Sequence, residues 1–391
     1  MLGIGSGGKS VIITASWLGW FSIFLVRFVP SPVLLLIERE FGLSHGGASL
    51  IFTSYLAAYS VMQIPAGILS DMLGPRRIIS IGLIVMSLSA IAIGFSQFFP
   101  LMILYSFLTG IGAGTFYTSS TSLISLIFPP RERGRVLGIA YSGIGAGTSI
   151  AIVMGGFLGH IYGWRLLFLI SSIPGFVSSI LFLHGIRGDQ YNPSQAMSRS
   201  SILALEMLRT RALQVYIAVH ALILITYFGV TSFTPTYIAS SSGLGIVEAN
   251  LVFLAFPLSE ILGGFIGGSL ADKLGAWRVS ITSFIVISIA VALIPLAYSP
   301  IYVALLLPLI GFMFRTAATA LPLLVVESTP SNIVGTILGW YNSIGFLGAS
   351  VGPYMFGIIA DRWGFFLSYI AISIFPLASI LMMLSIKNTS S

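Results

Sequence analysis

The chain has 391 residues, of which 56% are hydrophobic and only 7% are charged, and its net charge is +7. A soluble domain carries about 25% charged residues, so this composition excludes an ordinary soluble protein and indicates a chain that crosses a membrane many times. The absence of cysteine and the scattered positions of four His residues argue against disulfides, metal sites and redox centres. We therefore expect no cofactor and no metal.

Twelve apolar runs follow one another, each near or above the roughly 20 residues that cross the hydrocarbon core as a helix. They predict an all-α polytopic membrane protein with twelve transmembrane helices. The runs are 11–37, 48–70, 77–97, 100–128, 135–160, 164–185, 212–239, 249–271, 279–298, 300–327, 334–360 and 364–386.

Basic residues are distributed unequally between the loops. With the N-terminus in the cytoplasm, the outer loops receive only Arg39, Arg165 and Arg362, and nearly all other Lys and Arg residues fall on the inner side. The positive-inside rule favours this orientation, with both termini cytoplasmic in a multi-pass protein of the plasma membrane. Because the basic residues lie in short loops between apolar runs, we interpret them as orienting charges and expect no nucleic-acid partner.

A loop motif is written twice. Residues 67–77 read GILSDMLGPRR, and residues 268–278 read GSLADKLGAWR, at an offset of 201 residues. In each copy an acid ends one apolar run, and a Gly and an Arg precede the next. This pattern indicates a tight turn between two membrane helices, with the Arg beside the lipid headgroups.

The same offset aligns further glycines without an insertion, among them Gly110 with Gly311 and Gly163 with Gly364. Six spans in each half give both halves the same direction through the membrane. We therefore predict two parallel six-helix repeats around a central cavity. The expected division is a bundle at 1–185, a cytoplasmic linker at 186–211 and a bundle at 212–391.

Together these motifs resemble the major facilitator superfamily, whose signature G-x-L-a-D-r-x-G-r-r/k lies between helices 2 and 3 and has a weaker copy between helices 8 and 9. Gly348-Ala-Ser-Val-Gly352-Pro353 and Gly163-Trp164-Arg165 support the resemblance over essentially the whole chain. The resemblance implies alternating access by rocking of the two bundles. We assign the motif residues to a cytoplasmic gate: Asp71, Arg76, Arg77, Asp272 and Arg278.

A finer resemblance concerns helices 1 and 2. Arg27, followed by Tyr59-Ser-Val-Met-Gln63-Ile-Pro65-Ala-Gly67, is similar to the anion:cation symporter branch, in which an Arg of helix 1 meets an organic anion. Helix 5 carries Ala151-Ile152 where drug/proton antiporters have Gly-Pro. This difference favours import over drug export.

Three charged residues lie deep in the predicted spans: Arg27, Glu260 and Arg315. Their partners at the 201-residue offset are all uncharged. A charge at this depth costs at least about 2.5–3.5 kcal/mol, so each needs a partner or water. One interpretation is a structural Glu260–Arg315 pair that locks the C-terminal bundle. The other is a substrate site in which a carboxylate bridges the two Arg by bidentate hydrogen bonds.

Glu260 is the best candidate for proton coupling, since it is the one carboxylate near the predicted midplane. Polar and aromatic neighbours that could complete a substrate pocket are Tyr59, Gln63, Tyr117, Tyr227, Tyr341 and Asn342, together with Tyr55. Any single Tyr could equally pack between helices or anchor at the interface. We interpret His220 as a satisfied polar residue of the core.

Charged residues near the predicted outer ends are interpreted as solvated. Glu38, Arg39 and Glu40 are expected to form a helix cap in water, and Asp361 and Arg362 to belong to an outer loop. Residues 357–364 imitate the loop motif, but the offset puts them on the outer face, away from the predicted gate.

These features predict a secondary active transporter that takes up a small organic anion with a proton, as a monomer in the lipid bilayer. An anion exchanger, an inorganic-oxyanion transporter and a proton-coupled exporter or carrier of sugars or drugs remain alternatives. We do not expect an enzyme, because the chain has neither a nucleotide-binding G-x-x-x-x-G-K-S/T motif nor a nucleophile–base constellation at depth.

Overall fold

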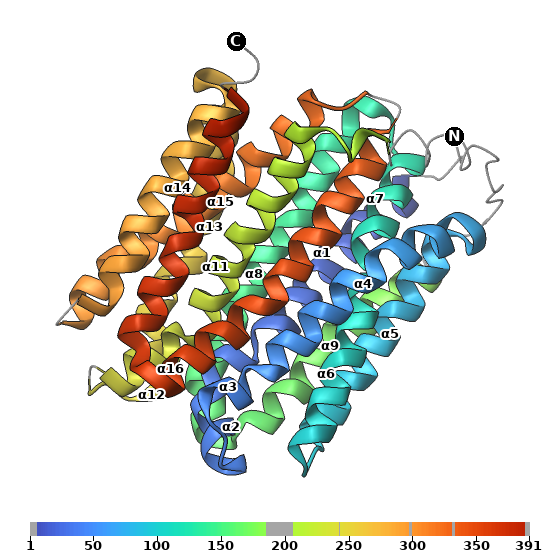
Figure 1. Ribbon diagram of the computed structural model, residues 1–391. Coiled ribbons are helices and arrows are strands. Elements are labelled where there is room, and N and C mark those ends of the chain that lie inside the picture. The colour runs from blue at the N-terminus through green and yellow to red at the C-terminus, as the bar shows by residue number, and fades with distance from the viewer. Residues whose placement is uncertain (1–5, 185–205, 242, 297–298, 331–332, 388–391) are drawn as a thin grey trace. The chain divides into compact units, whose positions relative to one another are not determined.

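The computed structural model describes residues 6–184, 206–241, 243–296, 299–330 and 333–387, and in these ranges the chain is built from helices (Figure 1). The predicted linker at 186–211 lies outside the described residues except for 206–211. The helices before it are α1 (Ser6–Phe28), α2 (Pro30–Phe41), α3 (His45–Ala48), α4 (Leu50–Leu73), α5 (Pro75–Gly94), α6 (Phe99–Gly114), α7 (Phe116–Ile127), α8 (Pro130–Tyr162) and α9 (Trp164–His184). Those after it are α11 (Arg211–Ser241), α12 (Ile246–Phe253), α13 (Ala255–Leu274), α14 (Ala276–Leu293), α15 (Pro300–Glu327) and α16 (Val334–Lys387).

Several spans are made of two helices in succession, such as α1 with α2 and α3 with α4. Counted in this way, the described residues contain 11 helical stretches that are long and apolar enough to cross a membrane. The last stretch is broken at Gly364, whose φ of 82° and ψ of 168° are not helical. With this break the stretches correspond to the twelve predicted spans, and the all-α membrane fold is confirmed.

The 201-residue repeat is visible in the backbone. Gly74 and Gly275, which open α5 and α14, have φ of 90° and 87° with the same ψ of 136°. Gly163 and Gly364 have φ of 83° and 82°. Left-handed φ values strain any residue that carries a Cβ, so glycine is required at these turns. The chain therefore turns in the same way at equivalent points of the two repeats.

Helix packing repeats as well. A Cβ added to Gly110 of α6 would overlap the carbonyl oxygen of Tyr55 in α4, and a Cβ added to Gly311 of α15 would overlap the carbonyl oxygen of Phe256 in α13. Both the glycines and the residues that they meet are 201 positions apart. Small residues at such crossings let two membrane helices approach backbone to backbone.

The chain packs as two compact units, whose boundaries differ from those of the sequence repeats at one segment. The first unit contains residues 1–36 and 54–194, and the second contains residues 37–53 and 195–391. Residues 37–53 belong to the first repeat in the sequence, yet α3 contacts α16 of the second unit. The chain therefore crosses between the units within α2 and again near the start of α4.

Gly110→Ala and Gly311→Ala should each destabilise the protein by about 1–3 kcal/mol, because the added methyl group overpacks a backbone contact. The controls are Gly138→Ala and Gly339→Ala, a repeat-related pair with nothing within 4 Å of the added Cβ. These helix-interior changes should be neutral or stabilising by about 0.5–1 kcal/mol. Thermal unfolding in detergent measures both, and equal melting temperatures in all four variants would contradict the packing argument.

Candidate functional site

Arg27 lies in the last turn of α1, where the span breaks at Val29 before Pro30 starts α2. The side chain is only 4% exposed. Its Nε–H donates to the Tyr55 hydroxyl at 3.3 Å. The guanidinium carbon lies 4.4 Å from the ring centre of Tyr59, 4.5 Å from that of Phe24 and 5.2 Å from that of Tyr55. A cation within about 6 Å of an aromatic ring centre is attracted by the ring quadrupole, so three rings stabilise Arg27 in this unit.

Two buried polar side chains adjoin this aromatic cage. Gln63, one turn after Tyr59 on α4, is 1% exposed, and neither atom of its amide has a hydrogen-bond partner among the described residues. Trp20, seven residues before Arg27 on α1, is 3% exposed, and its indole N–H is likewise without an acceptor there. Seven residues place Trp20 and Arg27 on one helix face, about 10 Å apart. The first unit thus carries, near Arg27, buried polar groups without hydrogen-bond partners among the described residues.

The predicted pocket residue Tyr117 joins this wall. Its ring lies 6.0 Å from that of Trp20, and Tyr59 and Tyr141 are near its hydroxyl group. The structure therefore brings together the predicted residues Arg27, Tyr59 and Tyr117. Sequence reasoning missed Trp20 and Phe24, although their spacing of seven and three residues from Arg27 on one helix was an available signal.

Glu260 of α13 and Arg315 of α15 lie within electrostatic range of each other in the second unit. Glu260 Oε2 accepts a hydrogen bond from the Tyr227 hydroxyl at 3.4 Å, and Arg315 is its electrostatic partner. The Tyr227 ring packs against Phe228, Phe256 and Phe314, which places this polar contact in apolar surroundings.

Two glycines make room for Arg315. A Cβ added to Gly263 would lie 3.1 Å from Arg315 Cβ, and one added to Gly264 would lie 3.6 Å from Arg315 Nε. These glycines follow Glu260 by three and four residues, so all three share one face of α13. The Arg315 side chain therefore lies against a strip of α13 without side chains, about one turn after Glu260.

The predicted residues Tyr341 and Asn342 lie together on α16, against α11. The Tyr341 ring stacks on His220 with centroids 3.9 Å apart and an interplanar angle of 16°, and the Asn342 side chain hydrogen-bonds to His220. His220 Nε2 is buried and has no hydrogen-bond partner among the described residues. His220 is therefore only partly satisfied, contrary to our interpretation of it. It lies two turns before Tyr227, on the same face of α11.

The predicted gate residues lie at helix ends. Arg76 donates from Nε to the carbonyl oxygen of Phe182 at 2.6 Å and from Nη2 to that of Leu183. It therefore caps the C-terminus of α9 within its own unit. The remaining gate residues, Asp71, Arg77, Asp272 and Arg278, are exposed.

A sequence model described as Major Facilitator Superfamily matches residues 16–353. The chain belongs to the Major Facilitator Superfamily. Two solved structures of a bacterial homologue of the human lysosomal transporter Spinster, described as inward-facing, share its fold. They have TM-scores of 0.81 and 0.84, at 17% and 18% identity, and cover 97% and 99% of this chain and 97% and 98% of theirs.

Curated relatives are similar along most of their length. The chain is 26% identical to the cis,cis-muconate transport protein of Acinetobacter baylyi, over 90% of both chains. It is 25% identical to the probable galactarate/D-glucarate transporter GudP of Escherichia coli, over 84% of this chain and 82% of that one. It is 24% identical to the gentisate transporter of Corynebacterium glutamicum, over 89% and 81%. The chain is thus a membrane transporter and not an enzyme, as predicted.

Tyr55→Phe should destabilise the protein, because Arg27 loses the Tyr55 hydroxyl as an acceptor inside a buried cage. Such a loss costs about 1–3 kcal/mol. Tyr302→Phe is the control, since the Tyr302 side chain is 60% exposed. Melting temperatures in detergent are the measurement. Equal values for the two variants would show that the Arg27 hydrogen bond contributes nothing to stability.

Proposed function

We propose that this chain is a secondary active transporter that takes up a small organic anion with a proton across the plasma membrane, with both termini in the cytoplasm. The observation that carries the proposal is Arg27, a guanidinium buried among three aromatic rings in the middle of a membrane span. The named substrates of the relatives, muconate, galactarate/glucarate and gentisate, are carboxylates and support it.

Arg27 suits a carboxylate for physical reasons. Its planar fork donates two parallel hydrogen bonds to a carboxylate, and it stacks on aromatic faces as it does here. The rings hold the cation by their faces, and their apolar bodies limit access of water. A charge-assisted hydrogen bond is stronger in such surroundings than in bulk water. The substrate carboxylate is therefore assigned to Arg27.

The wall around Arg27 favours a planar unsaturated or aromatic acid. Trp20, Phe24, Tyr55, Tyr59 and Tyr117 contribute ring faces and few polar atoms. A polyhydroxylated acid would leave several hydroxyl groups without partners against these rings, at a cost in affinity. The Trp20 indole N–H and the Gln63 amide are available for a second polar group at the far end of the substrate.

Glu260 is proposed as the proton-binding residue. It combines a carboxyl group in a membrane span with a hydroxyl donor, Tyr227, and a cationic neighbour, Arg315. Intramembrane carboxyl groups commonly serve proton relays, since their charge must be neutralised or paired. The competing role is a structural pair with Arg315 that only holds α13 to α15.

Uptake of labelled carboxylates into proteoliposomes tests the anion proposal. Arg27→Ala should raise KM at least about 10-fold, the equivalent of one charge-assisted hydrogen bond of about 1.5–3 kcal/mol. Arg39→Ala is the matched control, because Arg39 lies at the exposed end of the same span. Among cis,cis-muconate, gentisate and galactarate, the two unsaturated acids should be preferred. Wild-type KM in Arg27→Ala for every transported acid would refute the assignment.

Glu260→Gln should abolish uptake driven by a pH gradient while substrate exchange at equal pH continues. Glu248→Gln, at the exposed start of α12, is the control and should remain pH-driven. The structural role predicts a different pattern. It predicts a lowered melting temperature with coupling intact, and recovery of stability when Arg315→Gln is added to remove the uncompensated charge.

A further inference from the structure

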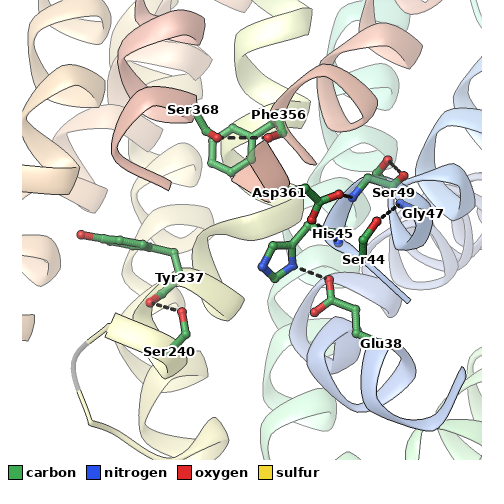
Figure 2. A network of polar contacts seen from close by, with 11 residues as sticks. Glu38, Ser44, His45, Gly47, Ser49, Tyr237, Ser240, Phe356, Asp361 and Ser368 are labelled. Carbon is green, nitrogen blue, oxygen red and sulfur yellow. Dashed lines mark hydrogen bonds and ion pairs between the residues drawn. The ribbon is translucent and has the colours of Figure 1, made fainter. Parts of the chain in front are cut away.

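A second polar network, which includes neither Arg27 nor Glu260, lies in the second unit (Figure 2). Asp361, near the kink of α16 at Gly364, accepts hydrogen bonds on both carboxylate oxygens. The donors are the backbone N–H of His45 and that of Gly46, each at 2.8 Å. Ser44 caps α3 from the other side by accepting from the N–H of Gly47 at 3.2 Å. The carboxylate thus binds the first two amides of α3.

These amides open a long span. Only Ser49 separates α3 from α4, and together they form the stretch His45–Leu73 of 29 residues. An anion beside the unpaired N–H groups at the start of a helix is favoured by hydrogen bonding and by the aligned peptide dipoles. Asp361 was expected to be an outer loop residue in water. It remains exposed, but both of its oxygens hold residues that come from the other sequence repeat.

The ring of His45 fixes the same segment. Its Nδ1 lies 2.8 Å from Oε1 of Glu38, whose side chain is only 6% exposed. The expectation that Glu38 is a solvated cap residue is therefore wrong. The His45 ring packs against Phe365 at 4.9 Å and Phe233 at 6.0 Å, between α16 and α11. Burial of Glu38 follows because the turn after α2 folds back, with the Leu43 N–H donating to the Glu38 carbonyl oxygen at 2.9 Å.

Backbone shape completes the contact. A Cβ on Gly357 of α16 would lie 2.7 Å from the carbonyl oxygen of His45 and 2.9 Å from Cα of Gly46. Four residues later, one helical turn on, comes Asp361. Because Gly357 has no side chain, the backbone of α3 can pack closely on the face of α16 that also carries Asp361. Further along, the Thr53 hydroxyl donates to the Ser350 carbonyl oxygen at 2.9 Å.

We propose that Asp361, Gly357, His45 and Glu38 form a releasable clamp that holds residues 37–53 on α16, and that its opening is a step of the transport cycle. The clamp holds the start of the second span, which belongs to the first sequence repeat, on α16 of the second repeat. If residues 37–53 leave α16 during transport, these hydrogen bonds must break. Since Asp361 is exposed, water can replace its two amide partners, which makes release possible. Asp361 is a positioning residue and does not touch the substrate. The clamp is independent of the anion assignment.

The natural absence of cysteine provides the test. Ser350→Cys places a thiol on α16, at a residue that is 6% exposed and whose carbonyl oxygen accepts a hydrogen bond from the Thr53 hydroxyl. The rate at which a membrane-impermeant maleimide labels this thiol in nanodiscs reports release of the segment. Asp361→Asn, which removes the charge, and Gly357→Ala, which adds a methyl group against the His45 carbonyl oxygen, should each raise the rate several-fold.

Matched controls are Arg362→Gln, at the exposed neighbour of Asp361, and Gly339→Ala, on the same helix with nothing within 4 Å of its added Cβ. Both should label at the parent rate. Hydrogen exchange at residues 42–49 should accelerate in Asp361→Asn, with the melting temperature within a few degrees of the controls. Parent labelling rates in both clamp variants would overturn the proposal. So would faster labelling that only follows a loss of thermal stability, since that result marks a static contact.

Discussion

Close approach of helix backbones through glycine is the constraint on which this structure depends. Lipid chains are as apolar as the side chains that face them, so burial of apolar surface does not drive helices together inside a membrane. Close packing must do so. The crossings at Gly110 and Gly311 meet carbonyl oxygens at equivalent points of the two repeats. The repeat is therefore a property of the backbone contacts, and not only of the loop motif.

The apolar surroundings of a membrane span also restrict where a charged side chain can lie. A guanidinium in a span must be stabilised locally, and the two units achieve this differently. In the first unit, ring faces of α1 and α4 surround Arg27 beside a break between two helices. In the second, Gly263 and Gly264 leave a strip of α13 against which Arg315 lies, near Glu260. We propose that the first arrangement presents a cation to the substrate carboxylate, and that the second places a cation near the proton-binding Glu260. The proposed division of labour between substrate and proton follows from this difference.

Charged side chains also bind the backbone groups at helix ends. Arg76 satisfies carbonyl oxygens at the end of α9, while Asp361 satisfies amide groups at the start of α3. Charges at the ends of membrane helices thus act on helix termini and not only on solvent. The contact at Asp361 connects residues of different sequence repeats. It is the contact that we propose to open during transport.

The sequence by itself determined the fold class, the twelve spans, the repeat and the family, because hydropathy over about 20 residues and glycine at forced turns are local properties of the chain. It also identified Arg27, Glu260 and Arg315, since an isolated charge stands out in an apolar run. Only the tertiary structure showed the rings around Arg27, the glycines against which Arg315 lies and the buried Trp20 beside Phe24. It also showed that Glu38, expected to be solvated, is buried, and that the exposed Asp361 accepts hydrogen bonds from the amides of His45 and Gly46. The amide partners of Asp361 lie more than 300 residues away in the sequence, and no local pattern encodes which helix end will meet which carboxylate.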